Sequence, residues 1–318
     1  MLSKDSTIRF STKSEFFSVS LSNGFSVFSV NPLRKVVHQV ISGHSFRNTI
    51  SLDNSDISIS SIPTEDSQTG NNVLCIFDSN LGKPVMLIER DDQIKNIFIS
   101  ELMFGFSTPT SVNIYTFNPP MIYYQYRTGI NAYGPCDFIQ MQGYYILGLS
   151  GRESGMLRII NSSRDDYSDV TIQGHSHPIS IMKFNKNGSM IATASDIGTI
   201  VQLYDTRSGK LISKLRRGNL PTEITSLCFS PESDYLAIAS AKGTVHVFSL
   251  LHISSSTVAN PIRAEMKITF PDTNYLVINF FSRSLMHVAT RKDLKTLKIN
   301  ALTNVITIKK EESYIDKL

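Results

Sequence analysis

Two adjacent arginines, Arg216 and Arg217, stand at the end of an apolar run with the alternation of a β-strand, directly before a turn that contains Gly218 and Pro221. Neighbouring side chains of a strand leave on opposite faces of its sheet. The two guanidinium groups therefore cannot share one pocket, and each must serve a different side. A guanidinium binds a phosphate or carboxylate through paired hydrogen bonds, so the two arginines could hold two anions at once. The dipeptide alone is equally compatible with an exposed basic pair on an edge strand.

The segments around these arginines form an internal repeat. Three pairs of residues share one offset of 45 residues: Phe184 and Phe229, Ser195 and Ser240, and Thr199 and Thr244. Each unit holds three short alternating runs, which is typical of one blade of a β-propeller. Seven units of this length would use the whole chain of 318 residues. We therefore predict an all-β fold, a seven-bladed β-propeller of the WD-repeat type, as a single domain over residues 1–318.

The repeat and the arginine pair together resemble the PROPPIN family, the phosphoinositide-binding propellers that include the WIPI proteins. The family's hallmark is Phe-Arg-Arg-Gly in the fifth blade, which residues 215–218 match with leucine in place of phenylalanine. The sixth blade of the family ends in a Thr-Val-His strand, which residues 244–246 match. The close match covers roughly residues 145–250, and residues 17–33 look like the first blade.

This resemblance implies two lipid-binding sites. The first would comprise His175, Thr193, Ser195, Gly198, Thr199 and Arg216. The second would comprise Arg217, Ser240, Thr244 and His246, with Arg263 at its edge. Arginine forks would bind phosphates, hydroxyl and imidazole groups would bind the remaining oxygens, and glycines would let backbone amides approach closely. Taken singly, each residue other than the arginines could instead be structural, whereas two copies around an arginine pair favour binding.

Two departures from the family pattern bear on affinity. Gln202 stands where the family usually has arginine, and a charge-assisted hydrogen bond contributes about 1.5–3 kcal/mol against roughly 1 kcal/mol for a neutral one. We therefore expect the first site to be the weaker one. Residues 250–261 form a short and mostly polar connection, whose apolar wedges are Leu251, Ile253 and Val258. Because this connection can insert few apolar side chains, we expect the protein to bind membranes shallowly and reversibly. Two simultaneous head-group contacts would then hold it on the membrane.

Composition narrows the class of protein further. A net charge of +4 is too small for general polyanion binding, so we expect no nucleic acid partner. No apolar stretch approaches the roughly 20 residues of a membrane span, and the N-terminus lacks an apolar signal core. The chain contains no nucleophile elbow, phosphate-binding loop or metal-spaced histidines. We expect a protein that is not an enzyme, with no cofactor and no metal.

Two segments are expected to lie outside the blades. Residues 48–72 are polar and rich in serine and aspartate, which predicts a surface loop within the second blade. The last residues, 309–318, read as a short charged tail.

The resemblance also implies partners and location. The lipids would be phosphatidylinositol 3-phosphate and phosphatidylinositol 3,5-bisphosphate, and protein partners would belong to autophagy or endolysosomal traffic, including a large lipid-transfer protein. The protein would be cytoplasmic and recruited peripherally to endosomal, vacuolar, lysosomal or pre-autophagosomal membranes. The alternative is a propeller scaffold that binds only proteins, with the arginines facing an acidic peptide. The duplicated serine, threonine and histidine set favours the lipid.

Overall fold

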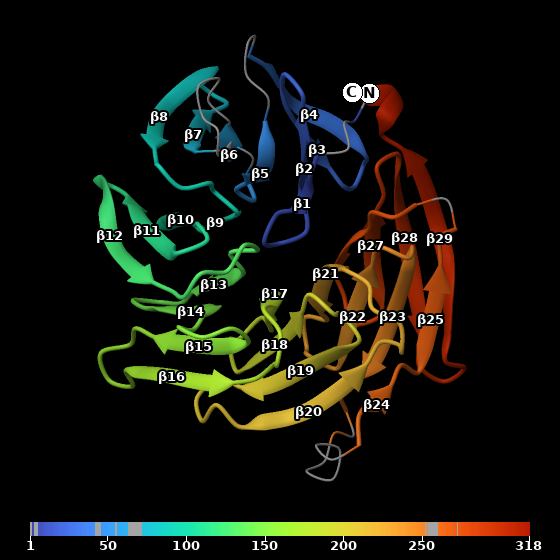
Figure 1. Ribbon diagram of the computed structural model, residues 1–318. Coiled ribbons are helices and arrows are strands. Elements are labelled where there is room, and N and C mark those ends of the chain that lie inside the picture. Colours follow the sequence, from blue (N-terminus) through green and yellow to red (C-terminus); the bar gives the residue numbers. More distant parts are fainter. Residues whose placement is uncertain are drawn as a thin grey trace. The chain divides into compact units, whose positions relative to one another are not determined.

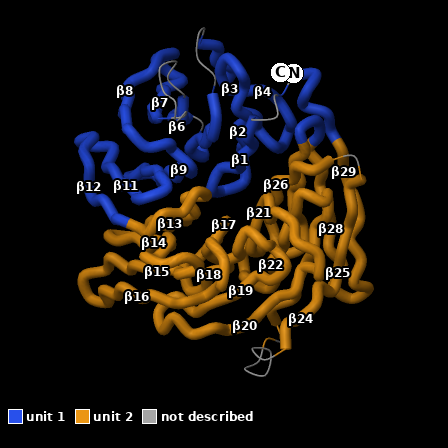
Figure 2. The backbone as a smooth tube through the Cα atoms, viewed as in Figure 1, with its two compact units in different colours: residues 1–127, 291–293, 312–318 blue, residues 128–290, 294–311 orange. Residues whose placement is uncertain are grey.

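The computed structural model describes residues 2, 6–41, 46–54, 56–62, 72–251, 253, 260–271 and 273–318. The chain divides into two compact units (Figure 2): residues 1–127, 291–293 and 312–318 form unit 1, and residues 128–290 and 294–311 form unit 2. Each unit consists of four-stranded antiparallel sheets, and one sheet of unit 2 gains a fifth strand in parallel (Figure 1). The described ranges contain no helix with the length and apolar character that a membrane span requires.

Unit 1 contains three four-stranded sheets. The strands of the first are β1 (Ile8–Phe10), β2 (Phe16–Leu21), β3 (Gly24–Ser29) and β4 (Arg34–Val40). Those of the second are β5 (Arg47–Ser51), β6 (Ile57–Ile62), β7 (Val73–Asp78) and β8 (Lys83–Glu89). Those of the third are β9 (Asn96–Ile99), β10 (Met103–Ser107), β11 (Ser111–Phe117) and β12 (Pro120–Arg127).

Unit 2 contains the other four sheets. The fourth has β13 (Cys136–Gln140), β14 (Tyr145–Ser150), β15 (Met156–Asn161) and β16 (Ser168–Gln173). The fifth has β17 (Ile179–Phe184), β18 (Met190–Ser195), β19 (Ile200–Asp205) and β20 (Leu211–Arg216), joined at its outer edge by β24 (Ile262–Arg263). The sixth has β21 (Ile224–Phe229), β22 (Tyr235–Ser240), β23 (Thr244–Ser249) and β25 (Met266–Thr269). The seventh has β26 (Val277–Phe280), β27 (Leu285–Ala289), β28 (Asp293–Asn300) and β29 (Val305–Ser313), before a 3-10 turn, η2 (Ile315–Lys317).

These seven sheets are the blades of a β-propeller, which confirms the predicted all-β fold class. The inner strands of a blade are covered on both faces, so their side chains are continuously apolar or small, as in β14 and β22, where every residue is buried. An outer strand such as β16 has one solvent face, and its residues alternate between half-buried and exposed. That the two units act as one domain over residues 1–318 stays a prediction.

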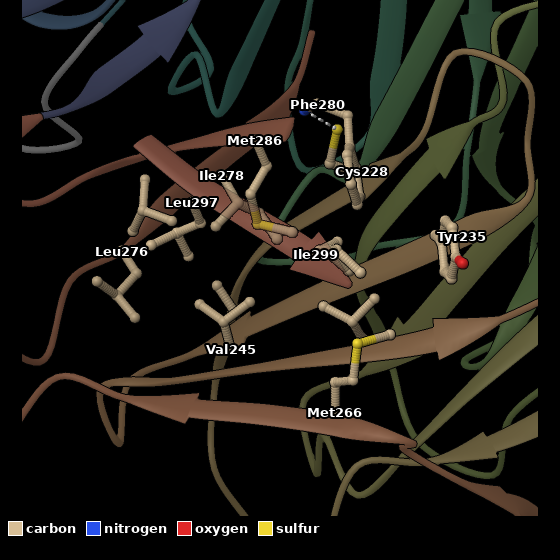
Figure 3. Close-up of a cluster of buried hydrophobic side chains, with 14 of the residues drawn as sticks. Cys228, Tyr235, Val245, Met266, Leu276, Ile278, Phe280, Met286, Leu297 and Ile299 are labelled. Carbon is tan, nitrogen blue, oxygen red and sulfur yellow. Dashed lines mark hydrogen bonds between the residues drawn. The ribbon is translucent and has the colours of Figure 1, made fainter. Parts of the chain in front are cut away.

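Apolar side chains fill the space between successive blades of unit 2. Figure 3 shows one such cluster, in which Val245 and Met266 of the sixth blade lie with Ile278, Met286 and Leu297 of the seventh. All five are at most 4% exposed. A second cluster joins the fifth and sixth blades in the same way. Packing of this kind fixes the spacing of the blades, whose strands and turns carry the polar residues considered below.

The predicted surface loop over residues 48–72 is wrong for its first half. Residues 47–51 and 57–62 are β5 and β6, and their serines and threonine are buried. The hydroxyl groups satisfy one another across the strands: Thr49 Oγ1 lies 2.9 Å from Ser60 Oγ, and Ser51 Oγ lies 2.8 Å from Ser58 Oγ. Paired hydroxyls allow a polar sequence to form an interior strand. Residues 55 and 63–71 lie outside the described residues.

The predicted charged tail also differs from the structure. Residues 309–313 belong to β29, and Tyr314 is fully buried. Its ring centroid lies 5.2 Å from that of Phe17 and 5.5 Å from that of Phe28, both in the first blade. Aromatic contacts at these distances stabilise beyond the burial of area. The end of the chain is therefore a packed part of unit 1.

Candidate functional site

Arg216 and Arg217 point to opposite sides of the fifth blade, as the strand alternation predicts. Leu215 is buried in the cluster that contains Leu236 and Ile238 of the sixth blade. Arg217, two residues further on, shares this side and is 7% exposed. Arg216 leaves on the other side, toward the fourth blade, and is half-buried. The last residue of β20 and the residue after it thus supply one cation to each of two neighbouring inter-blade faces.

The face toward the fourth blade carries most of the first predicted set. Thr193, Gln202 and Lys214 are register partners across β18, β19 and β20, and Arg216 follows Lys214 on the same face. His175 Nε2 lies 2.9 Å from Thr193 Oγ1. Gln202 Nε2 donates to the carbonyl of Gly174 at 2.6 Å. The loop before β17 is therefore held against the row of polar side chains.

The turn between β18 and β19 supplies backbone rather than side chains. Gly198 has φ +63°, and a Cβ built there would lie 2.0 Å from the carbonyl oxygen of Thr222. The carbonyl of Thr199 accepts hydrogen bonds from the amides of Arg217 and Gly218. Ser195 is buried at the end of β18. The backbone of this turn thus fixes the main chain at Arg217 and Gly218. Glycine is required at position 198 because any side chain would clash with the Thr222 carbonyl.

The guanidinium of Arg216 has a different environment from its neighbours. No described residue forms a hydrogen bond or ion pair with it. A guanidinium without a counter-charge can pair with an anion, and a phosphate matches its fork geometry. Arg216 is therefore the residue of the first set best placed to take a ligand.

Burial lowers the pKa of His175 to about 4; the hydrogen bond with Thr193 opposes this shift, and the Lys214 cation adds to it. The imidazole is consequently neutral near pH 7. It can donate or accept a hydrogen bond, but it contributes no charge to an anion site.

The second set lies between the fifth and sixth blades. Ser240 Oγ and Thr244 Oγ1 are 2.8 Å apart. His246 is two residues beyond Thr244 on the same face, opposite Lys267 of β25. Burial, followed by the charges of Lys267 and Arg217, lowers the pKa of His246 to about 4. His246 lies two residues before Phe248, which packs in the cluster between the fifth and sixth blades, so it is on the face that Arg217 also reaches.

Backbone carbonyls, not carboxylates, anchor Arg217. Its Nε donates to the carbonyl of Gly198 at 2.9 Å, and its Nη2 donates to that of Leu220 at 2.5 Å. Carbonyl dipoles orient the guanidinium without neutralising it, and burial lowers its pKa. A guanidinium has five N–H donors, so two bonds leave others for a ligand. Arg217 is thus a fixed, uncompensated cation.

The second and third strands of the fifth and sixth blades pair in registers that differ by one residue. The constant offset of 45 residues in the sequence does not reveal this difference. Ser240 is the register partner of Thr244, whereas in the fifth blade the partner of Ala194 is Val201. Ser195 therefore stands opposite residue 200, and Thr199 lies in the turn. Thr199 and Thr244 are not structural equivalents, although the sequence aligns them.

As a result, Gln202 occupies the position that His246 occupies in the sixth blade. Lys214 is likewise the counterpart of Lys267. Neither lysine is in the predicted sets. The signal that could have found Lys214 is its place two residues before Arg216, which puts both side chains on one face.

Arg263, which the resemblance places at the edge of the second site, lies next to Arg216 at the outer edge of the fifth blade. β24 lies beside β20 at the outer edge of the fifth blade (Figure 1). The two strands pair in parallel, and the register partner of Arg263 is Arg216. Of the expected apolar wedges, Leu251 is 48% exposed and Ile253 packs against the cluster between the fifth and sixth blades. Val258 lies outside the described residues.

Fold and site together define a β-propeller with a cationic, hydroxyl-lined face on each side of one outer strand. A family model described as PROPPIN matches residues 142–315, more than half of the chain. The chain belongs to the PROPPIN family of phosphoinositide-binding propellers.

Individual relatives agree with this assignment. SVP1-like protein 2 of Schizosaccharomyces pombe is 26% identical over 257 residues, covering 81% of this chain and 70% of the relative. Autophagy-related protein 21 of the same species is 35% identical over 143 residues, covering 43% of this chain and 40% of the relative. The solved structure of KlAtg21 in complex with the coiled-coil of AgAtg16 has a TM-score of 0.82, with 96% of this chain and 98% of that chain covered at 16% identity. Similarity at that identity shows the fold alone.

Proposed function

We propose that this protein is a peripheral membrane adaptor that recognises phosphatidylinositol 3-phosphate, phosphatidylinositol 3,5-bisphosphate or both. The observation that carries the proposal is the pair Arg216 and Arg217. Their guanidinium groups leave one strand on opposite faces, and no described carboxylate forms an ion pair with either. Each lies on a face that also carries hydroxyl and imidazole groups.

The chemistry of an inositol phosphate matches these groups. An arginine fork binds two phosphate oxygens, while a neutral histidine and a hydroxyl can each donate to a further phosphate oxygen or accept from a ring hydroxyl. A membrane also presents many copies of the same head group in one plane. Two sites on one edge can therefore bind simultaneously, and retention rises through effective concentration.

The adaptor role needs a protein partner as well as a lipid. KlAtg21 was solved with a coiled-coil bound, and one curated relative is an autophagy-related protein. These similarities support a role in autophagy or endolysosomal traffic, with recruitment from the cytoplasm to endosomal, vacuolar or pre-autophagosomal membranes. A large lipid-transfer protein is a candidate partner. In this role the protein binds lipid and protein partners and is not an enzyme.

Vesicle flotation tests the lipid proposal. The wild-type protein should float with phosphatidylcholine vesicles that contain a small share of phosphatidylinositol 3-phosphate. It should not float with vesicles in which phosphatidylserine supplies the same charge. Floating equally with both would contradict head-group recognition and favour a general electrostatic attraction. Floating with neither would favour the protein-only scaffold.

A further inference from the structure

β24 adds a fifth strand to the outer edge of the fifth blade. It pairs with β20 in parallel, with Leu215 opposite Ile262 and Arg216 opposite Arg263, whereas the four strands of the blade itself pair in antiparallel fashion. The segment that follows β23 thus returns to the preceding blade before β25 completes the sixth (Figure 1). This crossing brings residue 263 next to residue 216, which precedes it by 47 positions.

The packing of β24 fixes the side from which the Arg263 side chain leaves. Ile262 and Ala264 pack against the apolar cluster between the fifth and sixth blades, the cluster that contains Leu215. Successive side chains of a strand alternate between faces. Arg263 therefore points to the opposite side, which is the side of Arg216, and it is exposed.

Cations accumulate on this side without a described counter-charge. Lys214, Arg216 and Arg263 lie on the outer two strands, and no described residue ion-pairs with any of them. Neighbouring strands are only about 4.8 Å apart, and like charges opposite each other destabilise a sheet. A bound phosphate would offset this repulsion, because it can accept from two guanidinium groups at once.

The inner part of the same face offers no charge of its own. Gln202 is neutral, and its amide is already occupied: its nitrogen donates to the Gly174 carbonyl, and its oxygen accepts from the Tyr204 hydroxyl. His175 is neutral near pH 7. Positive charge for an anion on this face must come from the outer strands.

We infer that Arg263 is a phosphate-binding residue of the first site, where it acts with Arg216 on one phosphate group. This inference rests on the proposed function and assigns Arg263 to a different site from the one that sequence resemblance implied. Lys214 and Arg263 bring two positive charges to the first site and offset the charge that is missing at Gln202, so the first site is no longer expected to be the weaker one.

Calorimetric titration with inositol 1,3-bisphosphate, the soluble head group, tests the inference site by site. The second site is disabled by Ser240→Ala with Thr244→Val. These changes replace both partners of one hydrogen bond with apolar groups of similar shape, so they cost little stability. The first site is disabled by Arg216→Ala. Arg263→Ala is then added to the wild type and to each disabled protein.

Arg263→Ala should weaken the site that remains in the Ser240→Ala/Thr244→Val protein by about tenfold. It should leave the site that remains in Arg216→Ala unchanged. Arg263→Lys should restore part of the loss, since it keeps the charge but not the fork. Arg207→Ala is the matched control: it removes an exposed arginine near the other end of the same blade and should change neither site.

The opposite pattern, with the loss appearing only in Arg216→Ala, would return Arg263 to the second site and overturn the inference. No loss in any background would show that Arg263 binds no phosphate. A wild-type protein that binds neither the head group nor the lipid vesicles would remove the proposed function and the inference with it. Inorganic phosphate is titrated in parallel, and equal affinity for it would overturn assignment to a lipid head group.

Discussion

His175 Nε2 lies 2.9 Å from Thr193 Oγ1, and this contact joins the loop before the fifth blade to the row of polar side chains that ends near Arg216. Both residues are buried, so the contact is shielded from water. A buried imidazole in such a contact contributes hydrogen bonds, while the arginines contribute charge.

Acid should destabilise the folded protein through its buried histidines. Burial lowers the pKa of each of His175, His246 and His287 from 6.5 to about 4. Between these values the unfolded chain binds more protons than the folded one, so stability is complete above about pH 6.5 and falls as the pH drops toward 4. The loss should be on the order of 3 kcal/mol for each histidine. Thermal unfolding across this range measures it, and a flat midpoint would contradict the burial of the three rings.

The two arginines should differ in what they contribute to stability. Arg217→Ala removes the donors to the carbonyls of Gly198 and Leu220 and should cost about 1–3 kcal/mol, mostly through the Gly198 contact, which is buried. Arg216→Ala removes no described hydrogen bond or ion pair of the guanidinium group and should be within about 0.5 kcal/mol of the wild type. Urea unfolding separates them. Equal effects of the two changes would argue against the anchoring of Arg217.

Glycine should be required at position 198 but not at position 218. Gly198→Ala places a methyl group at φ +63° and against the Thr222 carbonyl, and should cost about 1–3 kcal/mol. A methyl group at position 218 would meet no atom within 4 Å, so Gly218→Ala serves as the matched control. Chemical unfolding of the two alanine variants provides the comparison. A tolerated Gly198→Ala would show that the turn between β18 and β19 can rearrange.

Binding to lipid vesicles should weaken as salt is added. The cations that face solvent, Arg216 and Arg263, are screened over about 8 Å at physiological ionic strength. Arg217 is more deeply buried and should be screened less. The dissociation constant measured at several salt concentrations should therefore depend more steeply on salt in the Ser240→Ala/Thr244→Val protein than in Arg216→Ala. Parallel salt dependences would contradict the difference in exposure.

Several features of the site could be predicted from sequence because they depend on local rules. Alternation along a strand places Arg216 and Arg217 on opposite faces, and the 45-residue repeat identifies the blades. The inner strands are also recognisable, since residues covered on both faces must be apolar or small. The sequence of β22 meets this requirement throughout.

Other features depend on distant contacts or on single residues in turns. The pairing of Arg263 with Arg216 joins a strand to a blade that precedes it in the chain, and no local pattern indicates it. Thr199 lies in a turn because the register between β18 and β19 differs by one residue from that between β22 and β23. The length of the repeat is the same in both blades, so the sequence does not show this difference. A serine-rich segment is typical of a loop, and Ser58 and Ser60 are therefore predicted to lie in one. Their hydroxyl groups instead pair with Ser51 and Thr49 on the neighbouring strand, which the local sequence does not indicate.

Flotation of Arg216→Ala and Arg207→Ala with phosphatidylinositol 3-phosphate vesicles tests directly whether Arg216 binds the lipid. Both variants lose one arginine from the fifth blade, but only Arg216 lies at the proposed site. We expect Arg207→Ala to float like the wild type, and Arg216→Ala to lose most of its binding while unfolding at the same temperature. Undiminished flotation of Arg216→Ala would contradict the claim that the arginine pair recognises the lipid.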